Sequence, residues 1–98
     1  MKNKQFINNL SKRLLTASRL GITFDYGDNH TWINFSEETA NSDTISLAEL
    51  LERNKIIPAC KSYLGILGAL DYIDSLLFSV GFDSLEKQFD NYDDWFKN

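Results

Sequence analysis

The chain has 98 residues, of which 43% are apolar and 13% aromatic, and its formal net charge is −4. This length corresponds to one domain, residues 1–98, and the apolar share excludes a disordered chain. A single cysteine, Cys60, excludes an internal disulfide, and no continuous apolar segment of the kind found in signal peptides follows the basic N-terminus. We therefore expect a cytoplasmic protein.

Charge is distributed unevenly along the chain. Residues 1–20 contain five basic residues and no acid, whereas residues 21–60 contain seven acids and two bases. The overall acidity argues against a nucleic-acid-binding protein and favours a basic protein partner. The alternative is that the basic and acidic parts neutralise each other within the domain.

Residues 3–20 are predicted to form a helix, because apolar side chains recur on one helical face and Gly21 follows as a stop. This narrow stripe favours packing on the core over binding to a membrane surface, where a basic amphipathic helix can also lie. The positions that form the stripe are Phe6, Ile7, Leu10, Leu14 and Ala17.

Residues 22–35 change to a period of two and predict a β-hairpin, with the strands ITFDY and TWINF joined by GDNH. A lone hairpin is marginal in water, so it needs a helix or a third strand to pack on. The candidate for a third strand is the short run 44–46. Residues 36–43, SEETANSD, predict an exposed acidic loop.

Two further helix starts follow from capping signals. Ser46-Leu-Ala-Glu49 has the spacing of a capping box, so we expect a short helix that ends near Asn54. Asp83 is a candidate cap for a last helix over residues 83–96. The acidic residues late in this segment oppose the helix dipole, which predicts a frayed last turn.

The strongest helical pattern predicts a long central helix from Pro58 to Val80, about 34 Å in length at 1.5 Å per residue. Pro58 suits a first helical position, and Gly81 suits the left-handed position after a helix. Asp71 and Asp74 within the pattern argue against a membrane span. The expected fold is α+β: an N-terminal helix, a β-hairpin, a short helix, a long central helix and a C-terminal helix.

Small residues interrupt the predicted central helix at Gly65, Gly68 and Ala69. Glycine within a helix costs stability, so this spacing suggests that another element approaches closely. The hairpin or the first helix is the favoured neighbour. A second subunit is the alternative, which leaves a homodimer possible.

Candidate catalytic residues are few. His30 and Cys60 could form a base and a nucleophile, but His30 falls in a turn and Cys60 on an apolar flank, which favours structural roles. Asp71 and Asp74 lie about one turn apart, and we interpret them as an exposed helix edge rather than as paired catalytic carboxylates. We expect no enzymatic activity.

Metal and cofactor sites are not indicated either. No Cys or His spacing resembles a zinc site, and no calcium-loop pattern surrounds the aspartates near the C-terminus. No glycine-rich loop of the kind that binds phosphate is present. We therefore expect no metal and no cofactor.

The remaining candidate site is an acidic surface that carries aromatic residues. Aromatic side chains anchor protein interfaces, and carboxylates steer a basic partner. The alternative is a solvated face whose aromatic residues turn into the core. The candidate partner-binding residues are Asp25, Asp28, Trp32, Glu37, Glu38, Asp43, Asp90, Tyr92, Asp93, Asp94 and Trp95.

Two stretches, ITFDYGDNHTWINFSEE and FDNYDDWFKN, mix aromatic and carboxylate residues in a small acidic chain. In this the chain resembles the small immunity proteins that bacteria make against their own toxins, including those of contact-dependent growth inhibition and bacteriocin systems. The resemblance implies a non-enzymatic inhibitor that binds a basic toxin nuclease. The alternatives are a phage or mobile-element inhibitor of a host defence enzyme, and a homodimeric adaptor or secretion chaperone.

Overall fold

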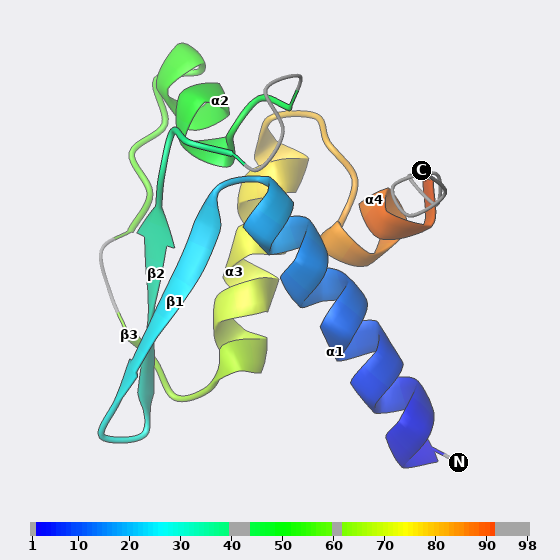
Figure 1. Cartoon of the computed structure of the whole chain (residues 1–98). Helices are drawn as coiled ribbons and strands as arrows, with labels where there is room; N and C mark the ends of the chain where they lie inside the picture. The colour runs from blue at the N-terminus through cyan, green and yellow to red at the C-terminus, as the bar shows by residue number, and fades with distance from the viewer. Residues whose placement is uncertain (1, 40–43, 60–61, 92–98) are drawn as a thin grey trace.

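The computed structural model describes residues 2–39, 44–59 and 62–91. In this part of the chain, four helices and a three-stranded antiparallel sheet form an α+β fold, as the sequence predicted (Figure 1). The elements in chain order are α1 (Lys2–Arg19), β1 (Ile22–Gly27), β2 (His30–Phe35), α2 (Leu47–Arg53), β3 (Ser62–Tyr63), α3 (Ile66–Ser79) and α4 (Leu85–Asn91).

The helices pack on different strands of the sheet and on one another. α3 packs on β2 and β3, whereas α1 packs on β1 and most extensively on α4. Figure 1 shows the sheet on one side of α3 and α4 on the other. No helix in the described ranges combines the length and the apolar character that crossing a membrane requires.

α1 confirms the helix predicted at the start of the chain. The rest of the fold covers only part of the apolar stripe along it. Ala17 is buried, and Leu10 and Leu14 pack against the core. Phe6 and Ile7 are exposed, because the N-terminal half of α1 extends beyond the other elements (Figure 1). Only the C-terminal half of the stripe therefore packs against the core.

The hairpin forms as predicted, with a shorter connection. β1 and β2 pair from Ile22 with Phe35 to Gly27 with His30, so only two residues form the loop. These are Asp28 and Asn29, with φ of 46° and 66°. Positive φ at both central positions is what a type I′ turn requires, and its twist matches that of the strands.

The predicted central helix is wrong in its first part. α3 begins only at Ile66, and Gly65 is its N-cap in an extended conformation. Residues 56–59 have no regular structure, and Ser62 and Tyr63 form β3, which pairs with Trp32 and Thr31. The third strand therefore lies inside the segment predicted as helix, and residues 44–46 form no strand.

Pairing with distant residues explains this error. Tyr63 gains a strand partner in Thr31, and its ring stacks on that of Tyr72 with centroids 5.7 Å apart. Glycine at positions 65 and 68 weakens the competing helix. A Cβ at Gly68 would lie 3.6 Å from the Tyr63 ring, which is an ordinary van der Waals contact, so packing does not require glycine there. The close approach predicted from the small residues is therefore not found between either glycine and another described element.

The capping predictions are confirmed for α2 and corrected for α4. The Ser46 hydroxyl accepts the Glu49 N–H at 3.1 Å, and α2 ends at Arg53. At α4 the cap is Ser84 rather than Asp83, because the Ser84 hydroxyl accepts the Lys87 N–H at 3.2 Å. The rest of the predicted helix, residues 92–96, lies outside the described residues.

One apolar core connects α1, β1, α2, α3 and α4. Its members are fully or almost fully buried, and the inner face of the sheet packs against them. The core residues are Ala17, Leu20, Ile22, Leu47, Leu51, Leu70, Ile73, Leu76, Leu77 and Leu85.

Candidate protein-binding surface

The basic side chains in the middle of α1 bind acids of α3 and α4. Lys12 Nζ lies 3.0 Å from an Asp90 carboxylate oxygen. Arg13 Nη2 lies 2.8 Å from Asp71 and 3.1 Å from Asp74. The predicted neutralisation within the domain therefore occurs between α1 and the second half of the chain.

The described acids of the hairpin region, from Asp25 to Glu38, form no such ion pair with another described residue. Residues 20–52 contain no Lys or Arg. Asp25 accepts a hydrogen bond from the Asn34 amide at 2.6 Å. The carboxylates of Asp28, Glu37 and Glu38 form no ion pair with any other described residue. Among the described residues, no ion pair thus compensates the negative charge of these three carboxylates.

One face of the sheet is left open by the helices. Along β1 and β2 the buried or half-buried apolar residues alternate with exposed ones, so the second face points away from the core. Asp25 and Trp32 are direct cross-strand partners on this open face. The two side chains that the sequence suggested as a carboxylate and an aromatic anchor are therefore neighbours.

Trp32 is held in place by its neighbours while 42% of its surface remains exposed. Its ring lies 6.2 Å from the His30 ring, at an interplanar angle of 31°. On the other strand, the indole packs over Gly27, where a Cβ would meet it in ordinary contact at 3.5 Å. A large aromatic group is thus presented to solvent beside a carboxylate.

The structure divides the predicted partner-binding residues among three places. Asp25, Asp28 and Trp32 lie together on the hairpin, whereas Glu37 and Glu38 follow the end of β2 that is farthest from the turn. Asp90 lies on α4, on the other side of α3 from the sheet (Figure 1), and pairs with Lys12. Five candidates lie outside the described residues: Asp43, Tyr92, Asp93, Asp94 and Trp95.

The other chemical candidates are placed as follows. His30 packs on Trp32 in the hairpin, and Cys60 lies outside the described residues. Among the residues that the structure describes, no group of three or more His, Cys, Asp or Glu gathers as metal ligands would. Asp71 lies on the exposed helix edge that we expected, but Asp74 is mostly covered, because α1 and the start of α4 pack over it.

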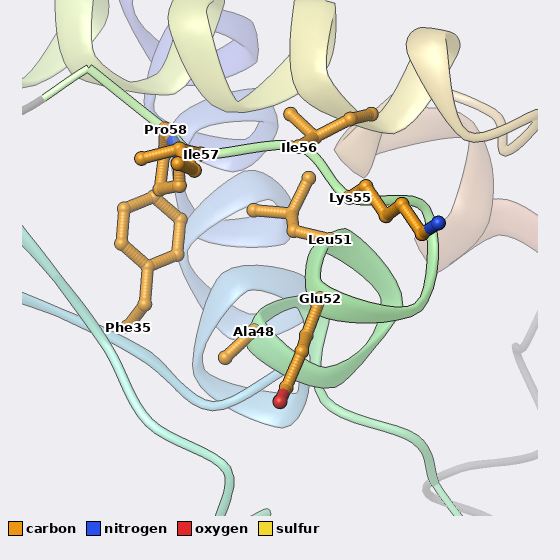
Figure 2. Close-up of a pocket in the computed structure, with 8 residues that line it drawn as sticks. All are labelled: Phe35, Ala48, Leu51, Glu52, Lys55, Ile56, Ile57 and Pro58. Atoms are coloured by element: carbon orange, nitrogen blue, oxygen red, sulfur yellow. The ribbon is translucent and has the colours of Figure 1, made fainter.

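Sequence reasoning missed an apolar pocket of about 470 Å³ between α2, β2 and residues 55–58 (Figure 2). The run Ile56-Ile57-Pro58 was its only local signal, because proline disfavours a helical conformation at the residue before it. The lining residues are Phe35, Ala48, Leu51, Glu52, Lys55, Ile56, Ile57 and Pro58.

A second hollow of about 490 Å³ lies at the hairpin turn. Residues 26–31 form one side of it, and Leu64 and Ile66 form the other. Tyr26 and Leu64 are largely exposed. The turn end of the hairpin therefore carries apolar surface close to Asp28.

Comparisons with known proteins find no relative of this chain. No protein-family model matches the sequence, and no curated protein and no solved structure matches it. Function is therefore inferred from the surface described above.

Proposed function

We propose that this protein is a non-enzymatic inhibitor that binds and neutralises a basic protein, a toxin nuclease, through the open face of the hairpin. The observation that carries the proposal is the division of charge. Lys12 and Arg13 neutralise acids of α3 and α4, whereas Asp25 and Asp28 form no ion pair with any described base.

This arrangement suits the recognition of a basic partner. Unpaired carboxylates raise the rate at which a positively charged surface arrives and orient it on approach. Trp32 then offers a large apolar contact at the centre of the same face, and tryptophan is among the residues that most often dominate binding energy. The pairing of the two strands holds both groups side by side.

The identity of the partner as a toxin rests on the resemblance to immunity proteins. That resemblance is carried by the stretch 22–38, which contains the open hairpin face, and by the C-terminal stretch. A phage or mobile-element inhibitor of a host defence enzyme would use the same surface. The partner's own activity distinguishes the two.

The test begins with affinity purification of the tagged protein from its native host and identification of the proteins that purify with it. We expect one stoichiometric basic protein whose nuclease activity is blocked in the complex. Its association rate should fall as ionic strength rises, because salt screens the carboxylates. An acidic or neutral partner, or an association rate that ignores salt, contradicts the proposal.

A charge-matched pair of variants assigns the effect to the hairpin. The double variant Asp25→Asn/Asp28→Asn should slow association about tenfold, a change of the size that loss of steering produces. Asp83→Asn/Glu86→Gln is the control, because it also removes two carboxylates, at and just before the first turn of α4. This control should leave the association rate within about twofold of the parent protein.

A further inference from the structure

The hollow at the hairpin turn lies on the side of the sheet that faces away from Asp25. Tyr26, which lines the hollow, follows Asp25 directly in β1, and successive residues of a strand point to opposite faces. The segment that leads from β3 into α3 runs beside the turn (Figure 1) and lines the hollow with Leu64 and Ile66. The hollow therefore adjoins the open hairpin face only at the turn, where Asp28 lies.

The lining of this hollow combines apolar surface with one carboxylate. The Tyr26 ring, Leu64 and Ile66 supply the apolar part, and the first two of these side chains are largely exposed. Asp28 is the one acid among the lining residues, and it forms no ion pair with another described residue. A purely apolar ligand would cover this carboxylate without pairing it, at a cost in free energy. The lining therefore suits a ligand with an apolar body and a positive charge.

The start of α3 also borders the hollow, and its charge has the opposite sign. Ile66 is the first residue of α3, and Gly65 before it provides no side-chain cap. A helix N-terminus is equivalent to about half a positive charge, whereas the Asp28 carboxylate carries a full negative one. The balance favours a cation, and it makes an anion the competing occupant that a test must exclude.

We propose that the hollow at the hairpin turn binds an arginine side chain of the basic partner. The partner that supplies this side chain is the one proposed above, so the assignment rests on that function. The aliphatic part of arginine packs on Leu64 and Ile66. Its guanidinium stacks on the Tyr26 ring and donates two hydrogen bonds to the Asp28 carboxylate. Lysine carries the same charge, but its ammonium has no flat face and no fork of donors that matches a carboxylate.

Blocked tripeptides test the site without the partner. The full-length protein, labelled with ¹⁵N, is titrated with Gly-Arg-Gly at about pH 8, where histidine side chains are ordinarily neutral and His30 adds no charge to the lining. We expect the largest amide shifts at residues 26–31 and 64–66. The lysine peptide should bind about threefold more weakly, and the peptide with citrulline, the uncharged analogue of arginine, about fivefold. Gly-Glu-Gly should not bind there.

Two variants and one control assign the binding to the lining. Asp28→Asn removes the charge and keeps the left-handed turn, which asparagine tolerates, so it should weaken binding about fivefold, the scale of one exposed ion pair. Tyr26→Leu removes an exposed ring and keeps an apolar contact, so it should weaken binding about threefold. Asp83→Asn removes an exposed carboxylate between α3 and α4 and should leave the affinity unchanged.

Four results would overturn the proposal. They are no amide shift at the hollow with Gly-Arg-Gly, equally tight binding of the lysine or citrulline peptide, tighter binding of Gly-Glu-Gly, and equal affinities of Asp28→Asn and Asp83→Asn. Because the titration needs no partner, these failures are distinct from those of the proposed function. A basic partner recovered from the host would still support that function, and peptide binding without such a partner would leave the arginine site alone.

Discussion

Arg13 and Asp74 join α1 to α3 through a hydrogen-bonded ion pair of 3.1 Å, in which the two side chains are only 15% and 18% exposed. The other oxygen of the Asp74 carboxylate accepts the backbone N–H of Leu85 at 2.8 Å, at the start of α4. One carboxylate therefore links three helices. Asp71 also accepts from Arg13, at 2.8 Å, but its side chain is 74% exposed.

Asp74→Ala should lower the free energy of unfolding by about 2 kcal/mol, because hydrogen bonds to charged groups contribute roughly 1.5–3 kcal/mol each when they are shielded from water. It also leaves the largely covered Arg13 guanidinium with the exposed Asp71 as its one acidic partner among the described residues. Urea unfolding followed by circular dichroism measures the loss.

Asp71→Ala is the matched control, since it removes the other acid that binds the same guanidinium. Its exposed ion pair should contribute less than about 1 kcal/mol. Equal losses for the two variants would mean that coverage by α1 and α4 does not strengthen the Asp74 contacts.

The parts of the fold that could be predicted have local signals. Gly21 ends α1, Asp28 and Asn29 supply the positive φ of the hairpin turn, and Ser46 caps α2 through its own side chain. Each of these depends on residues within a few positions of one another. Local chemistry is therefore sufficient to place them.

The start of α3 could not be predicted in this way. Tyr63 fits the helical stripe by spacing, but it pairs with Thr31, which is 32 positions earlier in the sequence, and stacks on Tyr72. Periodicity describes one face of a segment and carries no information on a strand partner elsewhere in the chain. A two-residue strand also leaves no alternation to detect.

The candidate site also has a part that could be predicted from the sequence and a part that could not. The spacing of the two strands makes Asp25 and Trp32 neighbours once the turn is known, so their proximity could be derived from the sequence. The separation of Asp90 from them depends on how α1, α3 and α4 pack, and on Lys12 as its partner. The apolar pocket likewise arises from segments that meet only in the folded chain.

Alanine variants at Gly21 and Gly81 separate two contributions to a loss of stability. One is a steric clash of the new Cβ, and the other is an unfavourable backbone conformation. Their φ values are +82° and +83°, so alanine is strained equally at both. At Gly21 a Cβ would also collide with the carbonyl oxygens of Ser36 and Glu38, whereas nothing lies within 4 Å of a Cβ at Gly81. Gly21→Ala should therefore lose more stability.

We expect Gly81→Ala to lower the free energy of unfolding by about 1–2 kcal/mol, the cost of a left-handed conformation for an L-residue. Gly21→Ala should cost at least about 2 kcal/mol more, because two backbone carbonyls must shift. Thermal unfolding of both variants measures the difference. If both variants lose the same free energy of unfolding, the segment after β2 moves away from the new Cβ at position 21 at no cost in stability.

Tyr63 makes stability depend on alkaline pH. Burial raises the pKa of its hydroxyl above the ordinary value of 10.0, and the neighbouring Tyr72 acts in the same direction. The folded state therefore favours the neutral phenol more than the unfolded state does. This contribution is fully present below about pH 10 and is lost as the pH rises through the folded-state pKa.

Tyr63→Phe removes this group without removing the ring. Above about pH 10 the free energy of unfolding should fall more steeply with pH for the parent than for Tyr63→Phe. Urea unfolding at a series of pH values measures both slopes. Tyr26→Phe, at an exposed hydroxyl, is the control, and parallel curves for the parent and Tyr63→Phe would refute the prediction.

Trp32 and Phe78 are two exposed aromatic residues on different elements, and only Trp32 lies on the open hairpin face. Trp32→Ala should weaken binding of the basic partner by at least about 2 kcal/mol, or roughly thirtyfold, as for an interface anchor. Phe78→Ala removes a similar exposed ring from α3 and should change the affinity by less than about threefold.

Isothermal titration calorimetry with the purified partner measures both affinities, and thermal unfolding confirms that each variant is folded. The loss for Trp32→Ala should persist at high salt, because an apolar contact is not screened, whereas the effect of Asp25→Asn should shrink. Equal losses for Trp32→Ala and Phe78→Ala, or a larger loss for Phe78→Ala, would move the binding surface from the hairpin to α3.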